Sequence, residues 1–280
     1  MSRSSRNWKT IPPERTRHGL AYVKVGDGPP LVLVHGIGGS HHAWGPVIDR
    51  LADSHTVYAV DLPGHGDSRG LDGDRPWTPR RHAEALATAL DDLDIDNPHV
   101  AGNSLGGWVG LELANLRPVA SLTLLSPAGL WKRRQPVYCA VSLFATWFGC
   151  RYNRRPLAAL SRRAWGRRLV FWQVYTHPEN LTPEHAIRDL TVMAGSSGFR
   201  PTMRACKPIR YQAGRELIEP VTLAFGESDR ILLPRQSRHT DQLPPHTRRL
   251  DLPDAGHVPM SDNPEQVCRV ILATTGKAVS

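Results

Sequence analysis

The sequence is poor in cysteine. Its 280 residues include only four, and these form neither a CxxC pair nor a spacing typical of metal ligands. A chain of this length buries enough surface to fold without a metal or a disulfide staple. We therefore expect reduced, structural thiols. The four are Cys139, Cys150, Cys206 and Cys268.

Long apolar segments are also missing. No stretch reaches the roughly 18 apolar residues that a membrane-spanning helix requires, and the longest uncharged run, Gln135 to Cys150, falls short of it. The basic N-terminus is not followed by an apolar segment, which argues against a secretory signal. Its composition leaves a transit peptide open, although Glu14 and two prolines disfavour a clean amphipathic helix. We expect a cytoplasmic protein.

Acidic residues are outnumbered, because 26 Asp and Glu face 35 Lys and Arg and give a formal net charge of +9. Ten basic residues lie between Leu130 and Val170, where no acidic residue occurs, and the rest of the chain has 25 basic and 26 acidic residues. No nucleic-acid-binding motif accompanies this charge, so we expect no nucleic-acid partner. The ten are Lys132, Arg133, Arg134, Arg151, Arg154, Arg155, Arg162, Arg163, Arg167 and Arg168.

Short apolar runs alternate with helical patterns along most of the chain. Runs that are apolar on both faces are typical of a parallel sheet covered by helices. Asn263 and Pro264 fit the N-cap and first position of a helix. Strands are predicted at 31–34, 56–60, 99–102, 121–125, 220–225 and 248–252. Helices are predicted at 43–52, 78–93, 104–116, 235–242 and 263–274.

The alternation predicts a doubly wound, mostly parallel α/β sheet. One segment departs from it: residues 128–219 show no strand pattern and are rich in arginine and aromatic residues. Because this segment lies between two predicted strands, we interpret it as a helical cap inserted into the sheet domain. The predicted organisation is an N-terminal extension (1–18), a core (19–127 and 220–280) and the cap (128–219).

The strongest motif is G-x-S-x-G at Gly102 to Gly106, with Ser104 at its centre. It lies directly after a predicted strand and before a predicted helix, the context in which such a serine is exposed on a sharp turn. The start of the helix supplies N–H groups and the positive end of the helix dipole. We interpret Ser104 as a catalytic nucleophile rather than as part of a glycine-rich turn.

A serine nucleophile needs a base, and the base needs an acid that orients it. Among 13 histidines, His257 follows the last predicted strand and precedes the last predicted helix, so it is the candidate base. Asp229, just past the fifth predicted strand, is the candidate acid, with Glu227 as a rival and an ion pair with Arg230 as the structural alternative. Solvated surface positions are expected for His41, His42, His239 and His246.

An oxyanion requires preset donors. The backbone N–H of Leu105, directly after the nucleophile, is one candidate. The other should come from the glycine-rich turn after the first long strand, with the N–H of Ile37 as first choice and that of Gly38 as second. A phosphate-binding loop is disfavoured here, because no lysine follows and the G-x-G-x-x-G spacing is absent.

Together these motifs resemble the α/β-hydrolase superfamily, in particular its capped members with a serine nucleophile. The motifs are His35-Gly36-Ile37-Gly38, the stretch from Asp61 to Ser68, the Ser104 turn and Gly256-His257, and the resemblance covers about residues 20–275. The order Ser104, Asp229, His257 is that of this superfamily. The resemblance implies an acyl-transfer or hydrolytic enzyme with no metal and no organic cofactor, and a structural role for the Asp61 loop.

The resemblance leaves several reactions open. We expect a small-molecule ester or related acyl substrate, apolar or lipid-like, cleaved through an acyl-enzyme. Relatives that cleave carbon–carbon bonds of dienones grip an anionic substrate with a cap arginine and tryptophan, for which Arg162, Arg163 and Trp165 are candidates by composition. A non-enzymatic ligand receptor on the same fold is the alternative from another class.

The cap offers two further questions. Its aromatic residues either pack it onto the sheet or line an acyl pocket; they are Tyr138, Phe144, Trp147, Phe148, Trp165, Phe171 and Trp172. Its basic residues form a solvated face, hold a substrate carboxylate, or bracket the Gln135–Cys150 run on an anionic membrane surface. The last interpretation predicts peripheral membrane contact.

Overall fold

In the computed structural model, which describes residues 8–277, the strands form one sheet in the order β1-β2-β4-β3-β5-β6-β7-β8. The first seven residues of the predicted N-terminal extension and the last three of the predicted core lie outside the described residues. The strands are β1 (Glu14–Arg15), β2 (Ala21–Val25), β3 (Pro30–Val34), β4 (Thr56–Val60), β5 (His99–Asn103), β6 (Ser121–Leu125), β7 (Val221–Gly226) and β8 (Arg248–Leu252).

Strands β3 to β8 pair in parallel, whereas β2 runs antiparallel to β4 and β1 antiparallel to β2. The predicted α/β class and mostly parallel sheet are therefore confirmed. All six predicted strands are present. The two antiparallel strands were not predicted: β1 has only two residues, and β2 is interrupted by the exposed Lys24.

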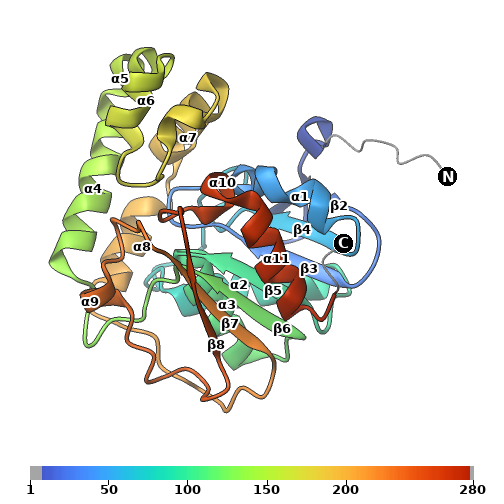
Figure 1. Cartoon of the computed structure of the whole chain (residues 1–280). Helices are drawn as coiled ribbons and strands as arrows, with labels where there is room; N and C mark the ends of the chain where they lie inside the picture. The colour runs from blue at the N-terminus through green and yellow to red at the C-terminus, as the bar shows by residue number, and fades with distance from the viewer. Residues whose placement is uncertain (1–7, 278–280) are drawn as a thin grey trace.

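Helices cover both faces of the sheet (Figure 1). One face packs against α2 and α3, and the other against α1, α10 and α11. This two-sided cover explains why the inner strands β4, β6 and β7 are buried along their whole length, whereas the edge strand β8 is mostly exposed. These helices are α1 (Gly45–Leu51), α2 (Pro79–Asp92), α3 (Leu105–Leu116), α10 (Pro259–Asp262) and α11 (Pro264–Thr274).

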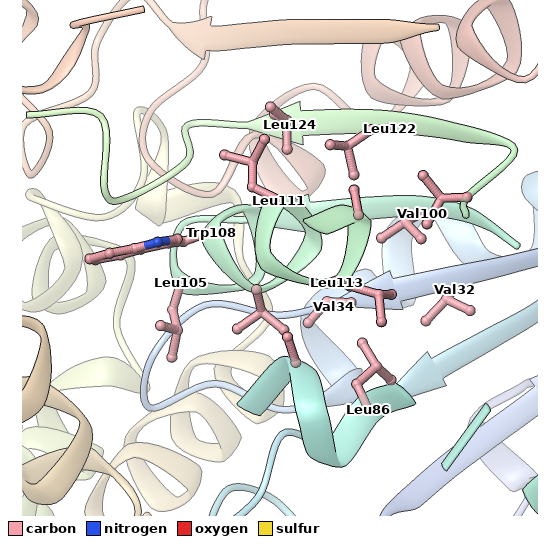
Figure 2. Close-up of a cluster of buried hydrophobic side chains, with 14 of the residues drawn as sticks. Val32, Val34, Leu86, Val100, Leu105, Trp108, Leu111, Leu113, Leu122 and Leu124 are labelled. Atoms are coloured by element: carbon pink, nitrogen blue, oxygen red, sulfur yellow. The ribbon is translucent and has the colours of Figure 1, made fainter. Parts of the chain in front are cut away.

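The core on the α2–α3 face is built from branched aliphatic side chains of strands and helices (Figure 2). Val34 of β3 and Leu124 of β6 lie in the same cluster as Leu86 of α2 and Leu111 of α3, and all four are fully buried. Each such side chain stabilises the fold by about 1.5–3 kcal/mol relative to exposure. This packing fixes α3, and with it the turn that precedes α3, against the sheet.

The segment between β6 and β7 is helical, and its helices α4 to α7 stand beyond one edge of the sheet domain in Figure 1. It comprises α4 (Val137–Tyr152), α5 (Arg154–Ser161), α6 (Ala164–Phe171), a 3-10 turn (Pro178–Asn180), α7 (Pro183–Gly195) and α8 (Phe199–Cys206). We call residues 128–219 the cap. Within residues 8–277, no helix combines the length and the apolar content needed to cross a bilayer.

Helix ends follow the capping signals of the sequence. The side chain of Asn263 accepts a hydrogen bond from the Gln266 N–H, which confirms the predicted N-cap of α11. The predicted helix 235–242 is wrong beyond its first turn, because α9 spans only Pro234–Ser237. The backbone leaves helical geometry at Arg238, and the next N–H, that of His239, bonds to the Leu130 carbonyl instead.

A cluster of buried histidines makes stability sensitive to acid. His65 is 1% exposed, and its ring lies between those of His35 and His82, at 5.5 and 6.2 Å. Burial, assisted by the neighbouring His35, lowers the pKa of His65 from 6.5 to about 3. As pH falls from 6.5 towards 3, the unfolded chain therefore binds a proton that the folded chain does not, and acid favours unfolding.

We predict that His65→Asn flattens the acid branch of the stability curve, because the variant removes this proton uptake. Asn can still offer an N–H where His65 Nδ1 lies 3.0 Å from the Pro63 carbonyl. For the wild type, the free energy of unfolding should lose up to about 1.4 kcal/mol per pH unit through this residue. Urea denaturation between pH 7 and 4.5 measures the slope. His246→Asn, at an exposed histidine, is the control, and equal slopes for wild type and His65→Asn would contradict the prediction.

Candidate active site

Ser104 occupies a sharp turn between β5 and α3. Its φ of 56° and ψ of −118° lie in a region that a residue with a side chain rarely adopts. The surrounding backbone fixes this conformation: the Ser104 N–H donates to the Leu125 carbonyl at 3.0 Å, and its carbonyl accepts from the N–H groups of Gly107, Trp108 and Ala128. Strain of this kind persists only where its neighbours hold it, and it is common at functional sites.

The two glycines of the motif allow α3 to pack closely against β5 and β3 at the turn. A Cβ on Gly102 would lie 2.3 Å from the Gly106 carbonyl oxygen, and a Cβ on Gly106 would lie 2.0 Å from that of Val34. Any side chain at either position would therefore push α3 away from β5 or β3. The sequence-based argument for small residues on both sides of Ser104 is confirmed.

His257 and Asp229 form a buried pair. His257 lies in the loop between β8 and α10, Asp229 follows β7, and Nδ1 of His257 is 2.9 Å from Oδ2 of Asp229. The other carboxylate oxygen, Oδ1, accepts from the N–H groups of Ile231 and Leu232, both at 2.9 Å. This arrangement requires the proton of the imidazole on Nδ1 and leaves Nε2 as the basic nitrogen.

The alternatives to Asp229 do not reach His257. Glu227 is exposed, and the guanidinium of Arg230 donates to the Trp172 carbonyl and stacks over the Trp172 ring. Within residues 8–277, Asp229 has no ion pair other than that with His257. Asp229 and not Glu227 is therefore the carboxylate that the structure places beside His257, and within residues 8–277 Asp229 forms no ion pair with Arg230.

The electrostatics keep Asp229 ionised. Burial on its own would raise the pKa of Asp229, but the charge and hydrogen bond of His257 and the two backbone N–H groups outweigh burial, so that the pKa is lowered. A buried carboxylate in this position can stabilise an imidazolium without taking up its proton. His257 can thus act as a general base, because the Asp229 carboxylate compensates the positive charge that His257 gains with a proton.

The glycine-rich turn after β3 lies against Ser104. A Cβ on Gly36 would come within 3.1 Å of the Ser104 Cβ. The Gly39 N–H bonds to the Gly36 carbonyl, and Gly38 has a φ of +73°, which together describe a type II turn with Ile37 and Gly38 at its centre. Within residues 8–277, the N–H groups of Ile37, Gly38 and Leu105 donate to no protein acceptor, so they are available to a ligand.

Buried histidines brace this edge of the sheet. Nδ1 of His35 is 2.7 Å from the Gly36 carbonyl, and Nε2 accepts from the Leu62 N–H at 2.9 Å, so a neutral His35 ties the turn to the next loop. Burial lowers the pKa of His35, which favours that neutral form. The expected solvated position of His41 is wrong: it is 3% exposed, and its N–H donates to Asp61.

His41, Asp61 and Asp67 are the one group within residues 8–277 whose side chains approach a metal-binding arrangement. The two oxygens of Asp61 are already occupied, because they accept hydrogen bonds from the N–H groups of His41 and Asp67. Nδ1 of His41 is also bonded to Asp61, at 3.0 Å. Asp61 is therefore a buried carboxylate whose hydrogen bonds stabilise the loop that follows β4.

Asn103 has a positioning role that the sequence analysis did not assign. Its side-chain Nδ2 donates to the His257 carbonyl at 2.9 Å and to the Leu125 carbonyl at 3.0 Å. The His257 N–H in turn donates to the Val174 carbonyl of the cap at 3.0 Å. The backbone of the candidate base is therefore held by the core on one side and by the cap on the other. Position next to Ser104 in the motif was the only available signal.

A pocket of about 550 Å³ lies between the sheet edge and the cap. Of the predicted site residues, Ile37, Gly38, Ser104 and His257 line it, whereas Asp229 lies behind His257. Leu105 does not line the pocket; it is the first residue of α3 and follows Ser104 directly. The cap supplies mainly aliphatic side chains, among them Leu143, Leu157, Leu160, Val170, Leu190 and Met193.

The aromatic residues of the cap divide between packing, pocket and solvent. Trp147 is buried and stacks on Phe199 at 5.5 Å. Tyr138, Phe171 and Trp172 line the pocket. The rest of the predicted set, Phe144, Phe148 and Trp165, is exposed and does not line it.

The charge of the cap does not reach the pocket. Within residues 8–277, no lysine or arginine lines it, and its one carboxylate, Asp189, accepts a hydrogen bond from the Tyr175 hydroxyl at 2.7 Å. Arg162, Arg163 and Trp165 are exposed outside the pocket. The buried Arg167 donates to the backbone carbonyls of Ser161 and Glu179, which is a structural role.

The chain is similar in sequence to known proteins. The model of the alpha/beta hydrolase family matches residues 31–270. The chain is 31% identical over 258 residues, or 88% of its length, to a dihydrolipoyllysine-residue acetyltransferase component of the acetoin cleaving system from Pseudomonas putida, and it spans 63% of that protein's length. It is 30% identical over 264 residues to a pimeloyl-(acyl-carrier protein) methyl ester esterase from Methylococcus capsulatus, covering 90% of the chain and 97% of the esterase.

A solved structure shows the same fold at lower identity. The enol-lactonase from Burkholderia xenovorans superposes with a TM-score of 0.74 at 21% identity, over 95% of this chain and all of the other. The family match spans the Ser104 turn, Asp229 and His257, and the mostly parallel sheet with helices on both faces is consistent with it. The chain belongs to the α/β-hydrolase family.

Proposed function

We propose that the protein is a serine esterase that cleaves small apolar or lipid-like carboxylic esters, or a closely related acyl bond, through an acyl-enzyme. The observation that carries the proposal is the convergence of Ser104, His257 and the free N–H of Ile37 on one apolar pocket, with Asp229 bonded behind His257. The fold and the esterase among the relatives support a hydrolytic enzyme.

In the proposed mechanism, Ser104 Oγ attacks the ester carbonyl carbon while Nε2 of His257 takes the hydroxyl proton. The N–H groups of Ile37 and Leu105 stabilise the negative oxygen of the tetrahedral intermediate, and Asp229 stabilises the imidazolium. When the intermediate collapses, His257 returns the proton to the departing alcohol. Water then attacks the acyl-enzyme with His257 again as base, which releases the acid and regenerates Ser104.

The pocket supports an apolar acyl group. Its volume of about 550 Å³ falls within the range of roughly 300–1,000 Å³ that is typical of small-molecule sites. The aliphatic cap residues would be removed from water by an alkyl or aryl chain, at about 25 cal/mol per Å² of apolar surface. Asp189 is unfavourable for an anionic substrate, since no cation of the described lining compensates it.

Because no lysine or arginine lines the pocket within residues 8–277, the pocket does not support carbon–carbon bond hydrolysis. A dienone carboxylate would need a cationic partner, and Arg162 and Arg163 lie outside the lining. The receptor alternative has the same pocket but predicts covalent retention after one turnover. Multiple turnover of an ester would therefore support the esterase, and retention of the ligand after a single turnover would support the receptor.

Replacement of Ser104 by alanine should lower turnover of a p-nitrophenyl ester by a factor on the order of 10⁴ or more, because the nucleophile is lost. A fluorophosphonate probe should label the wild type on the peptide that contains Ser104, as read by mass spectrometry, and should not label the variant. Ser54→Ala, in the turn before β4, is the control. Retention of most of the activity by Ser104→Ala would exclude the assignment.

Asp229→Asn should reduce kcat by a factor on the order of 10⁴, because an amide cannot stabilise the imidazolium and favours the wrong tautomer. The matched control is Glu227→Gln, the same chemical change two residues away at an exposed position, and it should retain full activity. Steady-state kinetics on both variants decides. If Glu227→Gln lost activity and Asp229→Asn did not, the acid would be Glu227.

Ile37→Pro tests the oxyanion donor directly. Proline removes the N–H, yet it is favoured at the second position of a type II turn, so the backbone should remain intact. We expect kcat to fall by about 10²–10³-fold with a smaller change in KM, since the lost bond acts mainly in the transition state. Ile37→Val keeps the N–H and should behave as wild type. Unchanged kcat in Ile37→Pro would assign the donor to another group.

A further inference from the structure

The outer surface of the cap carries an unusual density of exposed apolar side chains. On α4 they recur at spacings of three and four residues and therefore form one stripe along the helix. A second stripe on and directly after α6 has the same spacing. We call the two stripes the apolar cap face. Its members are Val137, Val141, Phe144, Phe148 and Tyr152 with Trp165, Leu169 and Trp172.

Packing within the chain does not account for this face. Of the 16 residues of α4, only Cys139, Trp147 and Cys150 are buried. Val137 is 72% exposed, and Phe148 is 50% exposed, although each could have been polar without loss to the core. Exposed apolar stripes of this kind are rare on a monomer and mark an interaction site.

The same region is strongly basic. Nine of the ten basic residues between Leu130 and Val170 are exposed, and no acidic residue occurs among them in the sequence. Within residues 8–277, only Arg168 of the nine has an ion-pair partner, Glu179. The basic residues flank the apolar stripes, with Arg133 and Arg134 before α4, Arg151 at its end and Arg154 and Arg155 opening α5.

We propose that the apolar cap face is a docking surface for an anionic lipid bilayer. Aliphatic and aromatic side chains would enter the boundary between headgroups and acyl chains, and the flanking arginines would contact anionic headgroups. Tyrosine and tryptophan, as at Tyr152, Trp165 and Trp172, are the side chains that prefer this interface. The docking is independent of the proposed esterase activity.

Other occupants fit the surface less well. A second copy of the chain placed face to face would bring two unpaired sets of cations together, which costs association energy. A nucleic acid would match the cations but leave the valine and phenylalanine side chains against phosphate and water. An anionic bilayer satisfies both the charge and the apolar surface.

The face is continuous with the entrance of the pocket. Leu169 is 63% exposed and Trp172 is 50% exposed, and both also line the pocket that contains Ser104. Tyr138, at 39% exposure, lines the same pocket from α4. Docking would therefore place the pocket entrance at the membrane surface, where an apolar substrate is concentrated.

Vesicle co-sedimentation of the full chain tests the proposal. We expect binding to phosphatidylcholine vesicles with about 30 mol% phosphatidylglycerol to be at least about tenfold tighter than binding to phosphatidylcholine alone, and to fall when salt is raised to about 0.5 M. Ser104→Ala should bind like the wild type, so that failure of docking and failure of the esterase proposal are distinguishable.

Two matched pairs of variants locate the contact. The double variant Val141→Gln/Phe148→Gln replaces two apolar residues outside the catalytic pocket with glutamine, which favours a helix, and it should weaken binding about tenfold. Ile218→Gln, at an 80% exposed site outside α4 and α6, should not weaken binding. Arg154→Gln/Arg155→Gln should weaken binding to anionic vesicles, whereas Arg248→Gln/Arg249→Gln, the same charge change on β8, should have a much smaller effect.

The variants should retain wild-type melting temperatures and wild-type rates on a short soluble ester. Equal binding to neutral and anionic vesicles would overturn the proposal, and so would equal losses in the cap variants and their controls. A dimer in solution that the Val141→Gln/Phe148→Gln variant dissolves would also overturn it, since a second copy would then be the occupant.

Discussion

The site depends on the backbone conformation of one residue. At φ 56°, Ser104 pays about 1–3 kcal/mol of strain, and hydrogen bonds on both of its peptide groups hold it there. The glycine at 106 lets α3 approach β3 so closely that a single Cβ would collide with the Val34 carbonyl. Because α3 starts directly at this turn, the Leu105 N–H and the positive end of the helix dipole lie next to Ser104. The proposed nucleophile and one of the two proposed oxyanion donors therefore share one structural cause.

Buried polar groups fix the loops around Ser104, in addition to apolar packing. His35 joins the glycine-rich turn after β3 to the Asp61 loop, and Asn103 holds the backbone of His257. A hydrogen bond fixes direction as well as distance, which an apolar contact does not. The arrangement works only with neutral histidine at position 35, and burial lowers the pKa of His35 accordingly. Acid sensitivity and precise loop placement thus have the same origin.

Sequence was sufficient to place the candidate residues where their positions depend on local chain geometry. Ser104 was recognisable because strand, turn and helix are adjacent in the chain, and His257 and Asp229 because parallel strands bring their carboxyl ends to one edge. Sequence was insufficient where a contact joins distant segments. The length of α9 depends on the His239 N–H, which leaves the helix for the Leu130 carbonyl, and the buried place of His41 depends on Asp61. The strand β2 was missed because an exposed lysine interrupts its apolar pattern.

The cap was the least predictable part, and α4 shows the reason. Its apolar residues have three destinations: Trp147 faces the core, Ala145 and Gly149 line the pocket, and Phe148 faces solvent. Periodicity reports that a residue is apolar but not which of three surroundings it meets. The same division separates the apolar lining from the charge, because within residues 8–277 no lysine or arginine lines the pocket that contains Ser104. The hydrogen bonds that fix Ser104 come from residues 107 to 128, ahead of every cap helix, so the backbone conformation of Ser104 does not depend on the outer surface of the cap.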